Sequence, residues 1–184
     1  MTPKQFDSRW RQELAYAEKA LFEDGIVHPL YAVVGGDGVT IPVAANFEDG
    51  QAKDRSLSVV RLLAVASNAI AVIHRAEAWI VAGDLADGIS PSQSDRRREV
   101  LVVTAQARLK GKTVQRFSLR EIERGDDGRP VALRGLQLPL SDGNLEGPMA
   151  DLLPPLAPIA EQRALAAALP GRMQERSGEP PHAA

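Results

Sequence analysis

Basic side chains gather in the middle of the chain, where they could bind phosphate or carboxylate groups. Residues 95–134 carry 11 Lys and Arg against 6 Asp and Glu, whereas the whole chain of 184 residues has a formal net charge of −2. Successive side chains of a strand point to opposite faces, so Arg98 and Arg108 would share one face of a strand, and Arg116 and Arg120 one face of the next. The four could then line up across the pair. The candidate binding residues are Arg96, Arg97, Arg98, Arg108, Arg116, Arg120 and Trp79.

Three interpretations of this basic strip, the six arginines named above, stay open. As a nucleic-acid site it would neutralise phosphates and bind in a salt-dependent way, although only Phe117 is nearby to stack on a base. As an interface it would pair with carboxylates such as Asp95 and Glu99 or with those of a neighbouring subunit, because guanidinium groups form two-pronged hydrogen bonds with carboxylates. As an ordinary solvated face it would be balanced by acidic helices.

Residues that could catalyse a reaction are sparse. The three histidines lie far apart without metal-ligand spacing, and the chain has no cysteine, so we expect no metal site, no cofactor and no catalytic residue. The serines within residues 90–94 precede Asp95, which leaves a small hydrolase built on this loop and His74 as an alternative. The Gly-x-Ser-x-Gly turn of many hydrolases is missing, however. The glycine-rich run 35–38 lacks the Gly-Lys-Ser/Thr ending of a phosphate-binding loop.

The elements that would position these residues follow from hydrophobic spacing. Apolar residues three or four apart predict helices over 3–23 and 54–68, with Asp54 or Ser56 as the N-cap of the second. That second helix is apolar on nearly every side, which is typical of a helix buried on more than one side. Residues 70–81 indicate a strand, with a helix continued to Ile80 as the alternative. The other predicted strands cover residues 30–34, 39–45, 94–109 with a charged lead-in, 113–123 and 131–138.

Together these elements predict an α+β domain over residues 1–138 in the order α-β-β-α-β-β-β. It would have a mostly antiparallel sheet of about five strands with two helices on one face. The other face, carrying Trp79, Val100 and Val102, would stay open and suit a homodimer or a partner interface. Residues 83–97 would form a long loop.

The composition changes after this domain. Residues 139–184 hold eight of the 13 prolines, which predicts an extended Pro-rich tail with a short helix near 159–169. Its Leu and Ile residues could dock onto its own domain or onto another chain.

Two runs, His74-Arg75-Ala76-Glu77-Ala78-Trp79 and Ser94-Asp95-Arg96-Arg97-Arg98-Glu99-Val100, resemble a pattern of short, uncharacterised proteins of bacteria and their phages. This resemblance covers about the middle third of the chain and implies no activity. The predicted element order is also similar to that of the roadblock and profilin-like scaffolds, whose members mostly act as dimerising interaction modules. That similarity of topology implies an interaction role. The long loop before Asp95 and the Pro-rich tail depart from it.

The leading hypothesis is a non-enzymatic interaction or assembly protein that self-associates through its open sheet face, with a second copy or another protein as partner. A nucleic-acid-associated protein that uses the basic strip is the alternative. Residues 1–10 are polar and charged and show no signal peptide, and the richest apolar run, 57–73, is interrupted by Arg61, Ser67 and Asn68. We therefore expect a soluble, cytoplasmic protein without membrane contact.

Overall fold

Two helices and six strands make up most of the part of the chain that the structure describes. The structure is a computed structural model, and it describes residues 1–47, 49–81, 91–136, 152–153, 160, 164 and 167–168. The elements are, in chain order, α1 (Pro3–Asp24), β1 (Leu30–Val34), β2 (Thr40–Ala44), α2 (Gly50–Ala66), β3 (Ala71–Ile80), a short 3-10 turn η1 (Pro91–Gln93), β4 (Arg98–Leu109), β5 (Lys112–Arg124) and β6 (Pro130–Gly135).

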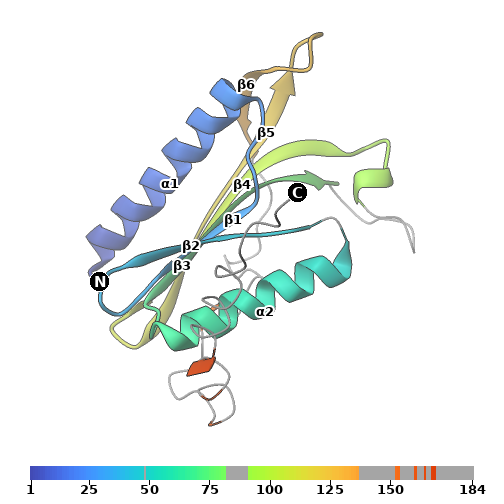
Figure 1. The fold of residues 1–184 in the computed structure, drawn as a ribbon. Coiled ribbons are helices and arrows are strands. Elements are labelled where there is room, and N and C mark those ends of the chain that lie inside the picture. The colour runs from blue at the N-terminus through green and yellow to red at the C-terminus, as the bar shows by residue number, and fades with distance from the viewer. Residues whose placement is uncertain are drawn as a thin grey trace, which may run out of the picture.

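The predicted α+β class and antiparallel sheet are confirmed, and the predicted element order is observed with one further strand at its end (Figure 1). The sheet has six strands where the sequence predicts about five, and residues 71–80 form a strand instead of continuing the helix before them. The strand order is β2-β1-β3-β4-β5-β6, and every neighbouring pair is antiparallel. A two-residue turn at Lys110-Gly111 sets Leu109 opposite Lys112. This register decides which side chains of β4 and β5 share a face.

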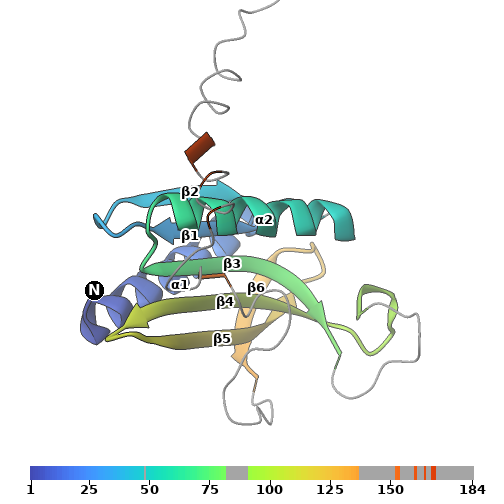
Figure 2. The ribbon, with the colours of Figure 1, turned by 90° about the horizontal axis from the view of Figure 1, so that it is seen from below.

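The two helices lie on opposite faces of the sheet, which corrects the prediction that both cover one face (Figures 1 and 2). On β1, Ala32 and Val34 belong to the core under α1, whereas Tyr31 and Val33 belong to the core under α2. The physical reason is that Leu30–Val34 is an unbroken apolar run. A strand of this kind is covered on both faces, because a single layer of helices would leave half of its apolar side chains in water.

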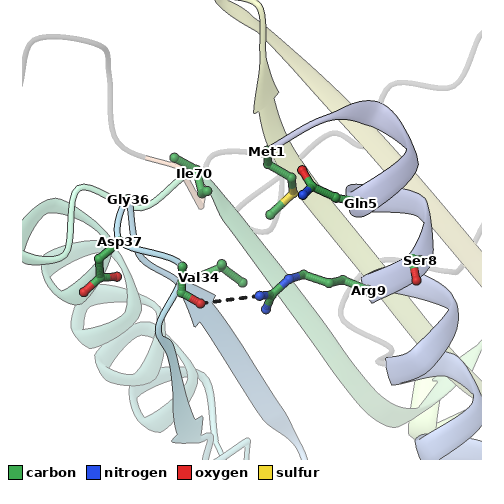
Figure 3. A pocket seen from close by; sticks show the side chains of 9 residues that line it. Met1, Gln5, Ser8, Arg9, Val34, Gly36, Asp37 and Ile70 are labelled. Carbon is green, nitrogen blue, oxygen red and sulfur yellow. Dashed lines mark hydrogen bonds between the residues drawn. The ribbon is translucent and has the colours of Figure 1, made fainter.

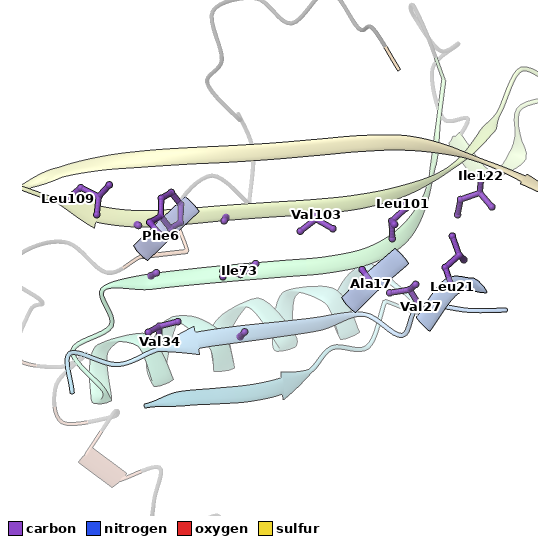
Figure 4. Close-up of a cluster of buried hydrophobic side chains, with 14 residues drawn as sticks. Phe6, Ala17, Leu21, Val27, Val34, Ile73, Leu101, Val103, Leu109 and Ile122 are labelled. Carbon is purple, nitrogen blue, oxygen red and sulfur yellow. The ribbon is translucent and has the colours of Figure 1, made fainter. Parts of the chain in front are cut away.

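The larger core fills the space between α1 and the sheet (Figure 4). Phe6 and Leu21, near opposite ends of α1, are 0% exposed, and full burial of such a side chain stabilises by about 1.5–3 kcal/mol. They anchor the helix along the strands. The buried sheet residues of this core include Ala32, Val34, Ile73, Leu101, Val103, Ala105 and Ile122.

Hydrogen bonds fix the ends of both helices. At the start of α1, Thr2 and Gln5 exchange side-chain and backbone hydrogen bonds in a capping box, and Gly25 ends the helix in the left-handed conformation with φ of 79°. Helix α2 begins earlier than predicted, because Asp49 and neither Asp54 nor Ser56 is its N-cap. Its polar first turns carry no apolar pattern, so hydrophobic spacing alone places its start too late.

Strand β2 forms one edge of the sheet and carries Pro42 at its centre. Ala45, just past the strand, donates its backbone N–H to Pro29 C=O on the inner side. Inner-facing and outer-facing backbone groups alternate along an antiparallel strand, so Pro42 faces outward. Because proline has no N–H, the middle of this edge offers no donor to a further strand.

Parts of the predicted loop and tail lie outside the described residues. These are residues 83–90 of the loop and most of residues 139–184. Within the predicted helix 159–169, residues 160, 164 and 167–168 are described and have helical backbone. Leu152, also described, is buried in the core under α2. In the described ranges, no helix is long and apolar enough to cross a bilayer.

Candidate interaction surface

The four arginines of the basic strip that belong to strands lie on two faces of the sheet and do not line up as predicted. Arg116 is opposite Ala105 and Arg120 is opposite Leu101, and the side chains of those two partners belong to the core under α1. The arginines of β4 at positions 98 and 108 therefore point to the other face. The turn at Lys110-Gly111 is the cause, because it pairs odd positions of one strand with even positions of the other.

On the α1 face, arginines of the sheet are paired with carboxylates of α1. Three such ion pairs have N–O distances of 2.8–2.9 Å: Arg75–Glu13, Arg116–Asp7 and Arg120–Glu18. Because each pair joins the helix to a strand, the pairs help to orient α1 across the sheet. They also neutralise positive charge that a phosphate ligand would otherwise contact.

The arginines at the start of β4 contact the neighbouring strands and the loop that precedes β4. Arg98 forms a two-pronged pair with Glu121 of β5. The Arg97 guanidinium lies over the Trp79 ring, 4.9 Å from its centroid, and donates to Ser92 C=O at 2.6 Å. The backbone N–H of Arg96 donates to the side chain of Ser94 in the turn before the strand. These contacts tie the loop to the sheet.

Trp79 lies on the α1 side of the sheet, which corrects its predicted place beside Val100 and Val102. It is opposite Glu99 in the β3–β4 pairing, and neighbours on β4 point to opposite faces. Trp79 is 41% exposed at the end of β3, where Arg97 covers its ring in part. Trp79 therefore does not contribute to the sheet face opposite α1.

The face opposite α1 carries half-buried apolar side chains beyond the reach of α2. The core under α2 contains residues of β1 and β3 but none of β4 or β5, and β4 and β5 run clear of that helix in Figure 2. Val102 is opposite both Ala76 and Leu119, which places apolar side chains side by side across three strands. We call this group the β3–β5 patch; its members are Ala78, Ile80, Val102, Phe117 and Leu119.

A cluster of three charged residues near the end of α1 was not predicted. Arg124 lies 2.9 Å from a carboxylate oxygen of Glu77 and 2.6 Å from one of Glu99, and it donates to Gly25 C=O at 3.0 Å. Burial raises the pKa of Glu77, and the adjacent Glu99 adds to this effect. The hydrogen bond from Arg124 lowers the pKa of Glu99. The three residues come from β3, β4 and β5, so only the strand register brings them together.

Replacing Glu77 with glutamine should favour the folded state progressively as the pH rises. The folded-state pKa of Glu77 is above its usual 4.5, so the contribution of this group to stability is full below pH 4.5 and is lost as the pH rises through the folded pKa. Glu77→Gln removes that loss. The difference in unfolding free energy between the variant and the parent, measured by urea denaturation, should therefore shift toward the variant above pH 4.5.

The matched control for this titration is Glu23→Gln. The Glu23 side chain is 63% exposed on α1, so a difference common to both variants reflects the loss of one carboxyl and not the surroundings of Glu77. A flat difference for Glu77→Gln, or one that shifts toward the parent, would show that the fold does not raise the pKa of Glu77.

A cavity of about 440 Å³ lies between the first turns of α1 and the loop that joins β1 to β2 (Figure 3). Arg9 reaches across it to the Thr40 hydroxyl at 2.9 Å and to Gly38 C=O at 3.4 Å. Three glycine N–H groups of the loop 35–38 donate to backbone carbonyls of the chain itself. Because these amides are occupied, the loop does not offer the cradle of free N–H groups that binds phosphate.

His74 is buried in an aromatic cluster under α2. Its ring lies 4.5 Å from the ring of Tyr31 and 5.7 Å from that of Phe47, between centroids. Burial, with a smaller effect of the Lys53 charge, lowers the pKa of His74 to about 3, so the imidazole is neutral at physiological pH. Neither ring nitrogen has a hydrogen-bond partner in the described ranges.

The described residues of the serine-rich loop lie away from His74. Ser92 lies beside Arg97, which covers Trp79 at the far end of β3. Five residues of strand, roughly 17 Å, separate that position from His74. The pairing of hydroxyl and imidazole that a hydrolase of this design needs is therefore not formed by the described residues of the loop.

One further contact, between Leu152 and Gln106, was not predicted from the sequence. The backbone N–H of Leu152 donates to Gln106 Oε1 at 3.2 Å, and both residues are buried. The only signal for this contact in the sequence is the apolar pair Leu152-Leu153 within the Pro-rich tail, and nothing there identifies β4 as its partner.

A scan against protein-family models, a search of curated proteins and a search of solved structures each found no match. Function is therefore inferred from the geometry of the described residues.

Proposed function

We propose that the protein is a non-enzymatic interaction module that self-associates through the β3–β5 patch. The observation that carries this proposal is a group of half-buried apolar side chains on the sheet face opposite α1, where, among the described residues, the core under α2 includes strand residues of β1 and β3 but none of β5. Apolar side chains on an uncovered sheet face are normally buried against another surface. Two copies related by a two-fold axis would bury the patch of each against the patch of the other.

The border of the patch supports a protein partner. Arg98 and Glu121 lie on the same face as the patch and form a two-pronged pair there. An apolar centre with a rim of polar, hydrogen-bonded side chains is the usual composition of a protein–protein interface. In a two-fold dimer such rim residues fix the register of the two copies and add little affinity.

The nucleic-acid alternative has less support. Arg98, Arg116 and Arg120 each pair with a carboxylate of the same chain, and a phosphate would have to displace that carboxylate. The arginines also point to two faces, so one backbone of a nucleic acid cannot contact them all. Trp79, the aromatic side chain at this end of the sheet, is already stacked under Arg97.

Replacing Phe117 with glutamate should convert the self-associated form to a monomer. The substitution puts a charge within the patch, where burying it unpaired costs several kcal/mol, so we expect the dissociation constant to rise by about 100-fold or more. Light scattering after size-exclusion chromatography, over a range of concentrations, should give 19.8 kDa for the variant and a larger, concentration-dependent mass for the parent.

Val39→Glu is the matched control, because Val39 is 57% exposed in the loop between β1 and β2, away from the patch. It should keep the mass of the parent, and circular dichroism should show that both variants fold. A parent that is monomeric at all concentrations, or a folded Phe117→Glu chain that associates as the parent does, would overturn the proposed function.

A further inference from the structure

A second docking feature lies under α2, where one residue of the C-terminal part of the chain is seated. Leu152 is 1% exposed and packs in a core that includes Tyr31, Leu57 and Val60. Leu153 packs at the margin of the same core. The side chain of Leu152 therefore completes a core that is otherwise built from α2, β1, β2, β3 and the residues that join them.

The seat also provides a polar contact. The Leu152 N–H donates to Gln106 Oε1, and Gln106 is itself only 2% exposed. A buried apolar anchor combined with a main-chain hydrogen bond is a common way to hold an extended peptide. Pro154 and Pro155 follow the anchor in the sequence, and proline reduces the conformational entropy that is lost when such a segment docks.

We propose that this seat, which we call the Leu152 groove, accepts the Leu152-Leu153 segment of a second copy in exchange for its own. The groove and the segment belong to the same chain, so the contacts are the same whichever copy supplies the segment, as in domain swapping. Residues 136–151 connect β6 to the anchor, and at full extension they span roughly 50 Å, enough to reach the groove of a neighbour. The choice between the two arrangements then depends on effective concentration.

This exchange goes beyond the proposed function, because it uses Leu152 and its groove and none of the patch residues. Each copy would give one segment and receive one, so the product is a closed dimer. The two modes of association can be separated by studying exchange in chains that carry Phe117→Glu, where association through the patch is removed.

The test mixes two full-length variants in that Phe117→Glu background. Leu152→Asp leaves a groove without an anchor to fill it. Ala64→Phe enlarges a 0% exposed side chain of α2 in the same core, so it fills the groove and releases an intact segment. Light scattering should give a monomer for each variant alone and about twice that mass for the mixture.

A labelled synthetic peptide with the sequence of residues 150–158 provides the second measurement. By fluorescence anisotropy it should bind the full-length Leu152→Asp chain saturably, and it should bind the chain with intact Leu152 at least about ten-fold more weakly, because the segment of that chain competes. The same peptide with aspartate in place of the first leucine is the control and should bind at least about ten-fold more weakly. This measurement does not depend on the folding of Ala64→Phe.

Either of two results would overturn the inference. If the native peptide does not bind the folded Leu152→Asp chain, the groove is not a docking site. If the peptide binds but the mixture of two folded variants keeps the mass of a monomer, a second copy is not the occupant. Failure of the patch would be recognised separately, since it is measured on chains with an intact Leu152.

Discussion

Replacing Leu152 with alanine is expected to lower the free energy of unfolding by about 2–5 kcal/mol. The residue lies outside every helix and strand, yet its side chain is 1% exposed in the core under α2. Truncation removes the transfer free energy of the buried methyl groups and leaves a cavity that the rigid strands β1 and β3 fill only in part. Urea denaturation of the full-length chain, followed by circular dichroism, measures the loss.

Leu153→Ala is a close control for this substitution. It changes the same residue type at the next position, where the side chain is only partly buried at the margin of the core, so its effect should be clearly smaller. Equal and small effects at the two positions would mean that the C-terminal segment does not hold its seat in solution. The proposed exchange of this segment would then lose its basis.

Replacing Arg124 with alanine is expected to lower the free energy of unfolding by about 2–3 kcal/mol, somewhat less than for a fully buried pair, because the Arg124 side chain is 26% exposed. Removing the guanidinium leaves the carboxylates of Glu77 and Glu99 adjacent without a cation between them. It also removes the hydrogen bond to Gly25 C=O at the end of α1. Thermal and urea unfolding at neutral pH measure the effect.

Two further variants show whether this loss comes from the charge cluster. Arg134→Ala breaks a pair with Glu123 in which the arginine side chain is 70% exposed, and it should cost at most about 1 kcal/mol. Adding Glu77→Gln to Arg124→Ala should restore part of the stability, because it removes one of the two facing negative charges. Strict additivity of these two substitutions would show that Arg124 does not interact with Glu77.

Hydrophobic spacing predicted the helices and strands well, since it depends on neighbours along the chain. The strand of residues 71–80 is an example. The spacing of apolar residues changes from three or four to two near Ala69, and β3 begins at Ala71. The start of α2 was placed too late, because a capping hydrogen bond from Asp49 and not an apolar pattern determines it. Local signals thus give the elements, and caps refine their ends.

Which face each side chain occupies was harder to predict. Arg98 and Arg116 would share a face only if even positions of β4 paired with even positions of β5. The turn at Lys110-Gly111 shifts this register by one position, and such a shift moves a side chain to the opposite face. The position of the helices had a signal in the sequence, the unbroken apolar run of β1. That run indicates cover on both faces, whereas the prediction placed both helices on one face.

Contacts between residues distant in sequence could not be predicted from one chain. Leu152 and Gln106 are separated by 46 residues, and nothing in either residue type identifies the other as its partner. The cluster of Glu77, Glu99 and Arg124 likewise depends on three strands meeting in one register. Such contacts follow from the tertiary packing and not from local pattern.

The proline in the edge strand β2 has a consequence for the size of any assembly. A fibre that grows by adding strands needs two edges with free backbone donors and acceptors on every copy, whereas Pro42 removes the central donor from one of them. Growth through backbone pairing is therefore less favourable at the β2 side of each molecule than at the β6 side. Two copies joined at their β6 sides would leave a proline-containing edge at each end, which disfavours the addition of further copies by strand pairing.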